Sequence, residues 1–89
     1  MSAKKQKYIK NMEFIMKLSD LNIGSVGKII AVGGEGALRD RFLDMGLTPK
    51  TVVKIVKKAP LGDPIEINLR NYELTLLIAD AEKIEVEEI

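Results

Sequence analysis

The second half of the chain is dominated by apolar residues that recur with a period close to two, the spacing of a β-strand with one buried face. Residues 51–57 are rich in β-branched side chains, and residues 65–69 alternate strictly between apolar and polar. The alternation returns in residues 74–78 and 84–87, while residues 60–64 form a turn cluster that contains two prolines. These runs predict a series of short strands joined by tight turns.

The first half of the chain predicts one further strand and one helix. Residues 28–32 are typical of a short buried strand, which a pair of glycines ends. Within residues 37–45, Leu38, Phe42 and Met45 lie at positions i, i+4 and i+7, which form one face of a helix. The glycine after Met45 stands where a left-handed residue commonly ends a helix.

Together the elements predict a mainly β protein, a small antiparallel β-barrel of about five strands with one inserted α-helix. A single helical turn is also expected at residues 79–82. The chain has 89 residues, which is enough for one domain with a small core.

Composition excludes several classes of function. The chain has no Cys and no His, which removes disulfides, thiolate metal sites and the commonest general base. No apolar run approaches the roughly 18 residues that span a bilayer, and no secretory signal is recognisable. These features favour a soluble cytoplasmic module with no cofactor and no metal site.

Charge divides the chain into two parts. Residues 1–15 carry a net charge of +3, and residues 16–89 carry −2. We therefore expect a flexible basic N-terminal extension at 1–15 and one domain at 16–89. The slightly acidic domain disfavours nucleic-acid binding as its main activity, because neutralising phosphates requires a concentrated basic face.

The motifs that could support catalysis are weak. The glycine-rich loop at residues 33–36 precedes a helix, as phosphate-binding loops do, but it lacks the Gly-Lys-Ser/Thr ending and contains Glu35. A loop that needs positive φ and tight packing is the favoured interpretation. Asp40 and Asp44 share one face of the short helix, where solvated carboxylates are the expected state. An enzyme is therefore not expected.

Apolar residues outside the predicted core indicate a surface for a protein partner. Leu43 lies off the apolar line of the predicted helix, and Leu47 follows the glycine that ends the helix; each taken alone is more typical of a residue that closes the core from the side. Leu61 lies at the tip of the proline-rich turn, where side chains normally face water. Leu77 lies on the polar side of the alternation in its strand. We predict a partner-binding site formed by Arg39, Leu43, Leu47 and Leu61, in which the arginine gives orientation and the leucines give buried area.

Four segments in order resemble the FeoA family of bacterial ferrous-iron uptake. They are residues 16–21 (MKLSDL), 24–29 (GSVGKI), 36–49 (GALRDRFLDMGLTP) and 59–66 (APLGDPIE), and the similarity covers residues 16–89. The resemblance implies an SH3-like β-barrel with an inserted helix and no enzymatic activity. It implies one partner, FeoB, the membrane ferrous-iron transporter with a cytoplasmic GTP-binding domain. Asp40 and Leu77 depart from the family pattern, in which we expect basic residues.

Two alternatives stay open at the level of sequence. The same type of barrel resembles the C-terminal domain of iron-dependent repressors, of which the chain would be a detached copy. A small nucleic-acid-binding barrel would use the basic extension with Lys54, Lys57 and Lys58, and its affinity would fall steeply with salt.

Overall fold

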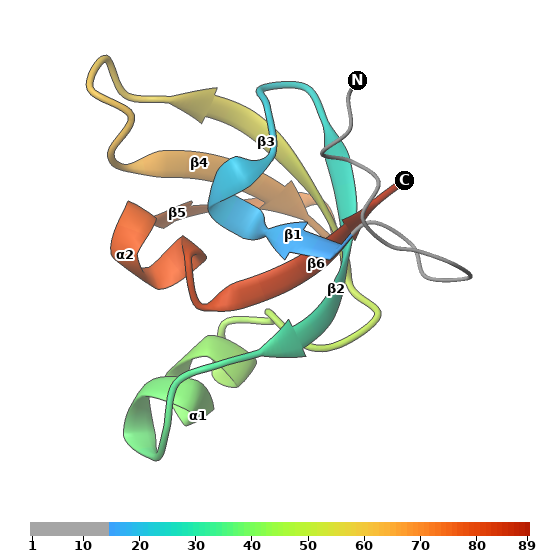
Figure 1. Ribbon diagram of the computed structural model, residues 1–89, viewed down its shortest axis with the longest axis vertical. Coiled ribbons are helices and arrows are strands. Elements are labelled where there is room, and N and C mark those ends of the chain that lie inside the picture. Colours follow the sequence, from blue (N-terminus) through green and yellow to red (C-terminus); the bar gives the residue numbers. More distant parts are fainter. Residues whose placement is uncertain (1–14) are drawn as a thin grey trace.

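The computed structural model describes residues 15–89. It contains six strands, two α-helices and one 3₁₀ helix (Figure 1). In chain order these are β1 (Ile15–Lys17), η2 (Leu18–Asp20), β2 (Val26–Val32), α1 (Ala37–Asp44), β3 (Val52–Lys58), β4 (Ile65–Leu69), β5 (Tyr72–Leu76), α2 (Ile78–Ala81) and β6 (Ile84–Glu88).

All six strands belong to one antiparallel sheet in the order β1-β6-β2-β3-β4-β5. The mainly β class with one principal helix is confirmed, and the sheet has one strand more than the five expected. The additional strand is β1, which pairs with β6 in the register Met16↔Val86. Among the described residues no ladder joins β1 to β5, so closure of the sheet into a hydrogen-bonded barrel is not seen.

The expected domain boundary falls within β1. Ile15, which we assigned to the extension, is the first residue of this strand. The prediction of a flexible basic extension otherwise concerns residues 1–14, which lie outside the described residues.

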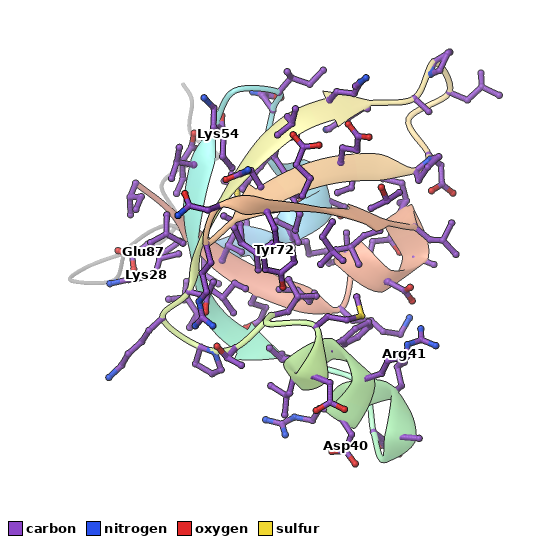
Figure 2. All side chains as sticks on the ribbon, turned by 180° about the vertical axis from the view of Figure 1, so that it is seen from behind. Lys28, Asp40, Arg41, Lys54, Tyr72 and Glu87 are labelled. Atoms are coloured by element: carbon purple, nitrogen blue, oxygen red, sulfur yellow. The ribbon has the colours of Figure 1, made fainter. Side chains whose placement is uncertain are left out.

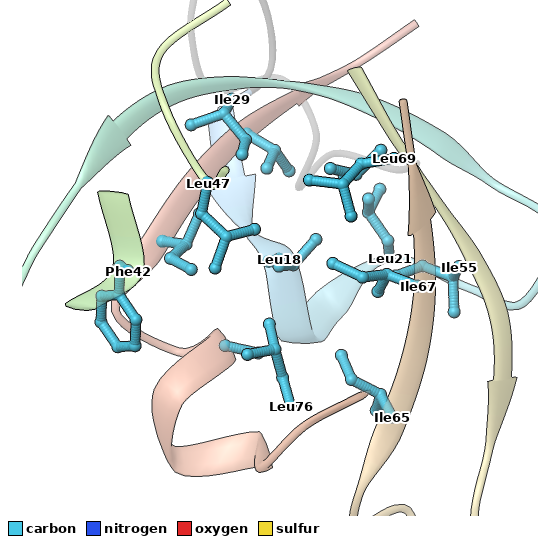
Figure 3. Close-up of a cluster of buried hydrophobic side chains, with 14 of the residues drawn as sticks. Leu18, Leu21, Ile29, Phe42, Leu47, Ile55, Ile65, Ile67, Leu69 and Leu76 are labelled. Atoms are coloured by element: carbon cyan, nitrogen blue, oxygen red, sulfur yellow. The ribbon is translucent and has the colours of Figure 1, made fainter. Parts of the chain in front are cut away.

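The core lies on the concave side of the curved sheet (Figure 3). The alternation that the sequence shows at 65–69 is the alternation of burial in β4, where every second side chain is fully buried. Leu18 and Leu21, at the start and just after the end of η2, are also buried in this core. Burial of each such side chain contributes about 1.5–3 kcal/mol to folding.

The end of β5 differs from the expected pattern. Ile78 continues the apolar alternation in the sequence, yet it is the first residue of α2 instead of the last residue of a strand. The expected helical turn is therefore present one residue earlier than predicted, over Ile78–Ala81.

Candidate protein-interaction site

The end of α1 decides the position of Leu47. The Gly46 N–H bonds to the Leu43 carbonyl at 3.0 Å, and the Leu47 N–H bonds to the Phe42 carbonyl, also at 3.0 Å. With Gly46 at a φ of 97°, these two bonds make a Schellman motif, which reverses the chain and directs the following apolar residue back to the helix. Leu47 is consequently 0% exposed and belongs to the same core cluster as Phe42 (Figure 3).

The placement of Leu47 on the partner surface is therefore corrected. A side chain with no exposed area contacts no partner while the domain stays folded. Its burial is a property of the helix end, because a glycine in the left-handed conformation lets the chain fold back over the last turn.

Arg39 and Leu43 both lie on α1, and both have contacts within the domain. The Arg39 Nε donates to the Val32 carbonyl at 3.2 Å, which ties the helix to the end of β2. Leu43 is half-buried against the core. The Arg41 Nη2 atom on the same helix lies 3.9 Å from the Asp80 Oδ2 atom of α2, and Figure 2 shows the Arg41 side chain directed from α1 towards α2.

Leu61 is the most exposed large apolar side chain in the described part of the protein, at 95%. It lies at the tip of the turn between β3 and β4, which the Gly62 N–H closes by bonding to the Ala59 carbonyl at 2.7 Å. Gly62 has a φ of 88°, the left-handed conformation that this turn requires. The prediction that Leu61 lies on a loop tip facing water is confirmed.

Leu77 accompanies Leu61 on this side of the molecule. It is 56% exposed and directly precedes α2. The carboxylate of Asp63, two residues after Leu61, accepts a hydrogen bond from the Ile78 N–H at 2.9 Å, so the turn and the start of α2 are in contact. The alternation in the sequence indicated that Leu77 is exposed, but not that it lies beside the proline-rich turn.

A small open cavity of about 130 Å³ lies at the base of the same turn. Its lining consists of side chains from the outer face of β3, β4 and β5 and from both ends of the turn, namely Lys57, Ala59, Pro64, Glu66 and Thr75. The Lys57 Nζ and Glu66 Oε1 atoms are 3.9 Å apart across this surface. The cavity extends the exposed region around Leu61 with mixed apolar and charged walls.

The predicted residues do not form one patch. The helix α1 and the β3–β4 turn lie at opposite ends of the longest axis of the molecule (Figure 1). The structure thus separates Leu61 from Arg39 and Leu43, and the Asp63–Ile78 bond places the turn that carries Leu61 against the start of α2, next to Leu77. The exposed apolar surface at the β3–β4 turn, defined by Leu61 and Leu77, is called the hairpin surface below.

The glycine-rich loop before α1 is tightly packed. The Gly33 N–H donates to the Lys83 carbonyl at 2.7 Å, and a Cβ atom at Gly33 would lie 2.7 Å from that same oxygen. Gly34 and Gly36 have φ values of 86° and 56°. These contacts agree with the packing interpretation of the loop.

The carboxylates and the helices of residues 15–89 bear on metal binding and on membrane insertion. In this part of the chain, no three carboxylate side chains gather in a group that could hold a metal ion. Neither of its α-helices has the length and hydropathy that crossing a bilayer requires.

Solved structures with a similar fold show the structural class to which this sheet belongs. The FeoA protein of Stenotrophomonas maltophilia, described as an SH3 domain protein, has a TM-score of 0.72 and is 24% identical, covering 81% of this chain and 89% of that chain. A FeoA-like protein from Clostridium acetobutylicum has a TM-score of 0.78 at 37% identity and covers 84% of this chain and 87% of that one. The chain is thus a small mainly β protein with an SH3-like fold.

The family follows from the sequence. The FeoA domain model matches residues 16–88. A fusion protein of Porphyromonas gingivalis, Fe(2+) transport protein A joined to Fe(2+) transporter FeoB, is 40% identical over 72 residues, which are 81% of this chain. The chain corresponds to only 8% of the length of that fusion protein. This chain belongs to the FeoA domain family.

The repressor alternative has a counterpart at the level of fold. A manganese-dependent transcriptional repressor has a TM-score of 0.78, covering 88% of this chain and 44% of that one, at 13% identity. At this identity the likeness concerns the fold alone.

Proposed function

We propose that this chain is a non-enzymatic accessory protein of ferrous-iron uptake, which acts in the cytoplasm as a protein-interaction module on the FeoB transporter. The observation that carries the proposal is the Porphyromonas gingivalis relative, in which a FeoA protein and FeoB form one polypeptide. Fusion holds two domains at a high effective concentration, which is useful where the two domains contact each other. Iron is then the cargo of the transporter and needs no ligand from this chain.

The composition supports a role without catalysis. The chain contains no Cys and no His, so it lacks the side chains that most often act as covalent nucleophile and general base near neutral pH. Its carboxylates Asp40 and Asp44, the pair considered from the sequence, are both exposed on α1. Exposed carboxylates retain their hydration and offer no shaped site for a substrate.

We further propose the hairpin surface as the main contact with the transporter. Leu61 is 95% exposed, and transfer of its apolar surface from water to a partner would be favourable for binding. Leu77 and the cavity beside the turn enlarge the area available to the partner. Arg39 and Leu43 remain predicted contacts at the opposite end of the molecule.

An NMR titration tests the partner and the surface together. The ¹⁵N-labelled full chain is titrated with the GTP-binding domain of FeoB from the same genome. The proposal predicts amide shifts that begin at Leu61 and Leu77; shifts at Arg39 and Leu43 would add α1 to the contact. No shifts at several hundred micromolar would limit any contact to weaker than about −4 to −5 kcal/mol and would contradict the proposal for this domain of the transporter.

A further inference from the structure

Within residues 15–89, three residues other than glycine have a left-handed backbone, and all three lie at one corner of the molecule. They are Lys50 with a φ of 78°, Arg70 with 50° and Asn71 with 71°. Lys50 ends the loop between α1 and β3, and the other two form the turn between β4 and β5. The two segments are joined because the Arg70 guanidinium donates from Nη2 to the Thr51 hydroxyl at 3.0 Å.

Two of the three side chains at this corner, Lys50 and Arg70, are not those that a left-handed backbone favours. A two-residue hairpin turn with positive φ at both positions favours Asn followed by Gly, and here the first position is Arg. Lys50 also occupies a conformation that costs free energy for side chains other than Gly, Asn and Asp. Strain of this kind persists where surrounding bonds enforce it, and it concentrates at functional sites.

The guanidinium of Arg70 is held in a defined position. Its acceptor, the Thr51 hydroxyl, is 2.8 Å from the Thr48 hydroxyl, and Thr51 is buried. A guanidinium has five N–H donors, and the Thr51 bond is the one that the structure gives it within residues 15–89. The remaining donors form the planar fork that binds a carboxylate in a bidentate way.

Neither Lys50 nor Arg70 has an ion-pair partner within 4 Å among the described residues. The ion pairs found there, Arg41–Asp80 and Lys57–Glu66, involve neither Lys50 nor Arg70. Next to the turn, Tyr72 is 43% exposed and reaches from β5 to donate its hydroxyl hydrogen to the Met45 carbonyl (Figure 2). Arg and Tyr, the residue types of Arg70 in this turn and Tyr72 beside it, are enriched among energetically important interface residues.

We infer that this corner, formed by Lys50, Arg70 and Tyr72, binds a carboxylate-rich segment of a protein partner. Arg70 pairs with one carboxylate through its free donors, Lys50 supplies the second positive charge, and the tyrosine ring supplies apolar area. The inference rests on the proposed function only for the identity of the partner, the transporter. The acidic segment would be a second contact, separate from the hairpin surface.

The test uses a probe that does not depend on the transporter. The ¹⁵N-labelled full chain is titrated with an eight-residue peptide of Asp and Glu at low salt, and amide shifts are followed. We expect the largest shifts at Lys50, Arg70 and Tyr72, and in the double variant K50E/R70E an affinity lowered about tenfold or more. The matched control K17E/K58E reverses two charges elsewhere and should change the affinity less than about threefold, because its lysines are not in the corner.

A single substitution separates binding from folding. Lys50→Gly removes the side chain and relieves the left-handed strain, so we expect Tm to rise by a few degrees while the peptide affinity falls. A variant that binds the peptide as well as the wild type would overturn the inference. So would shifts centred on Lys57 and Lys58 or on the N-terminal lysines.

Two further titrations complete the test. One compares anionic lipid with the acidic peptide, and the other separates the proposed function from the inference about the corner. Vesicles of anionic phospholipid should give weaker shifts at the corner than the peptide; stronger ones would overturn the assignment to a polypeptide. If the transporter domain fails to bind while the peptide binds at the corner, the proposed function fails and this inference stands. If the transporter domain binds and the peptide does not bind at the corner, the inference alone fails.

Discussion

At Gly46 the chain leaves α1 with a φ of 97° and turns towards β3. A Cβ atom at this position would lie 2.7 Å from the Tyr72 hydroxyl oxygen, which itself bonds to the Met45 carbonyl. Two separate demands, left-handed backbone and lack of space, therefore require glycine here. At Gly24 only the left-handed backbone requires glycine, since its φ is 90°. Space is not limiting there, because a Cβ atom would have no neighbour within 4 Å.

Alanine variants at these two glycines separate the cost of backbone strain from the cost of a steric contact. We predict that Gly24→Ala lowers the free energy of unfolding by about 1 kcal/mol through backbone strain. Gly46→Ala should cost more, about 2–3 kcal/mol, because the tyrosine must also move. Urea denaturation measures both, and an equal loss in the two variants would contradict the close packing at Gly46.

Truncation to alanine should lower the free energy of unfolding strongly at Leu47 and hardly at all at Leu61. Leu47 is fully buried, so Leu47→Ala is predicted to lower the free energy of unfolding by about 2–5 kcal/mol. Leu61 is 95% exposed, so Leu61→Ala should leave it within about 0.5 kcal/mol of the wild type. Thermal denaturation of the two variants checks the assignment of one leucine to the core and the other to the surface.

At the scale of elements, α2 depends on a side chain from the β3–β4 turn. The Asp63 Oδ1 atom accepts the hydrogen bond of the Ile78 N–H, one of the backbone donors that the start of a helix leaves free. We predict that Asp63→Ala lowers the free energy of unfolding by about 1 kcal/mol and speeds amide exchange at Ile78. Asp63→Asn keeps an acceptor oxygen and should restore most of the loss; if it behaves like the alanine variant, the bond is not the cause.

The elements that the sequence predicts well are those with a strong local period. The alternation at 65–69 coincides with β4, and the helical spacing of Leu38 and Phe42 coincides with α1. β1 was missed because a three-residue strand has no period of its own and exists through pairing with β6, about 70 positions away in the sequence. Ile78 was assigned to a strand because the local alternation does not show its contact with Asp63, which lies 15 positions earlier in the sequence.

At the scale of the whole molecule, the predicted surface divides into two regions. The sequence identified Leu61 correctly as exposed, since a turn between two strands of a hairpin faces water. It could not show that α1 and the β3–β4 turn lie at opposite ends of the molecule (Figure 1), because the path of the sheet between them decides this. Closing the core was one of the two roles that the sequence allowed for Leu47, and the hydrogen bonds at the end of α1 select it.

The separation of the two regions has a consequence for mutational tests. Leu43 packs against the core, so Leu43→Asp would disturb folding as well as any contact. Leu61→Asp changes a side chain that is free of the core, and it isolates the hairpin surface. Val52 offers a control, since it is also an exposed apolar residue, at 46%, and lies at the start of β3, at the end of the strand away from the turn.

The most direct test of the central claim is titration calorimetry of the wild type, Leu61→Asp and Val52→Asp with the GTP-binding domain of FeoB. We predict that Leu61→Asp weakens binding at least about tenfold, as expected when a charge enters the centre of an apolar contact. Val52→Asp should weaken binding clearly less than Leu61→Asp, because it leaves the hairpin surface intact, and both variants should keep the wild-type Tm within a few degrees. Equal affinities for the wild type and Leu61→Asp would contradict the assignment of the hairpin surface as the contact with the transporter.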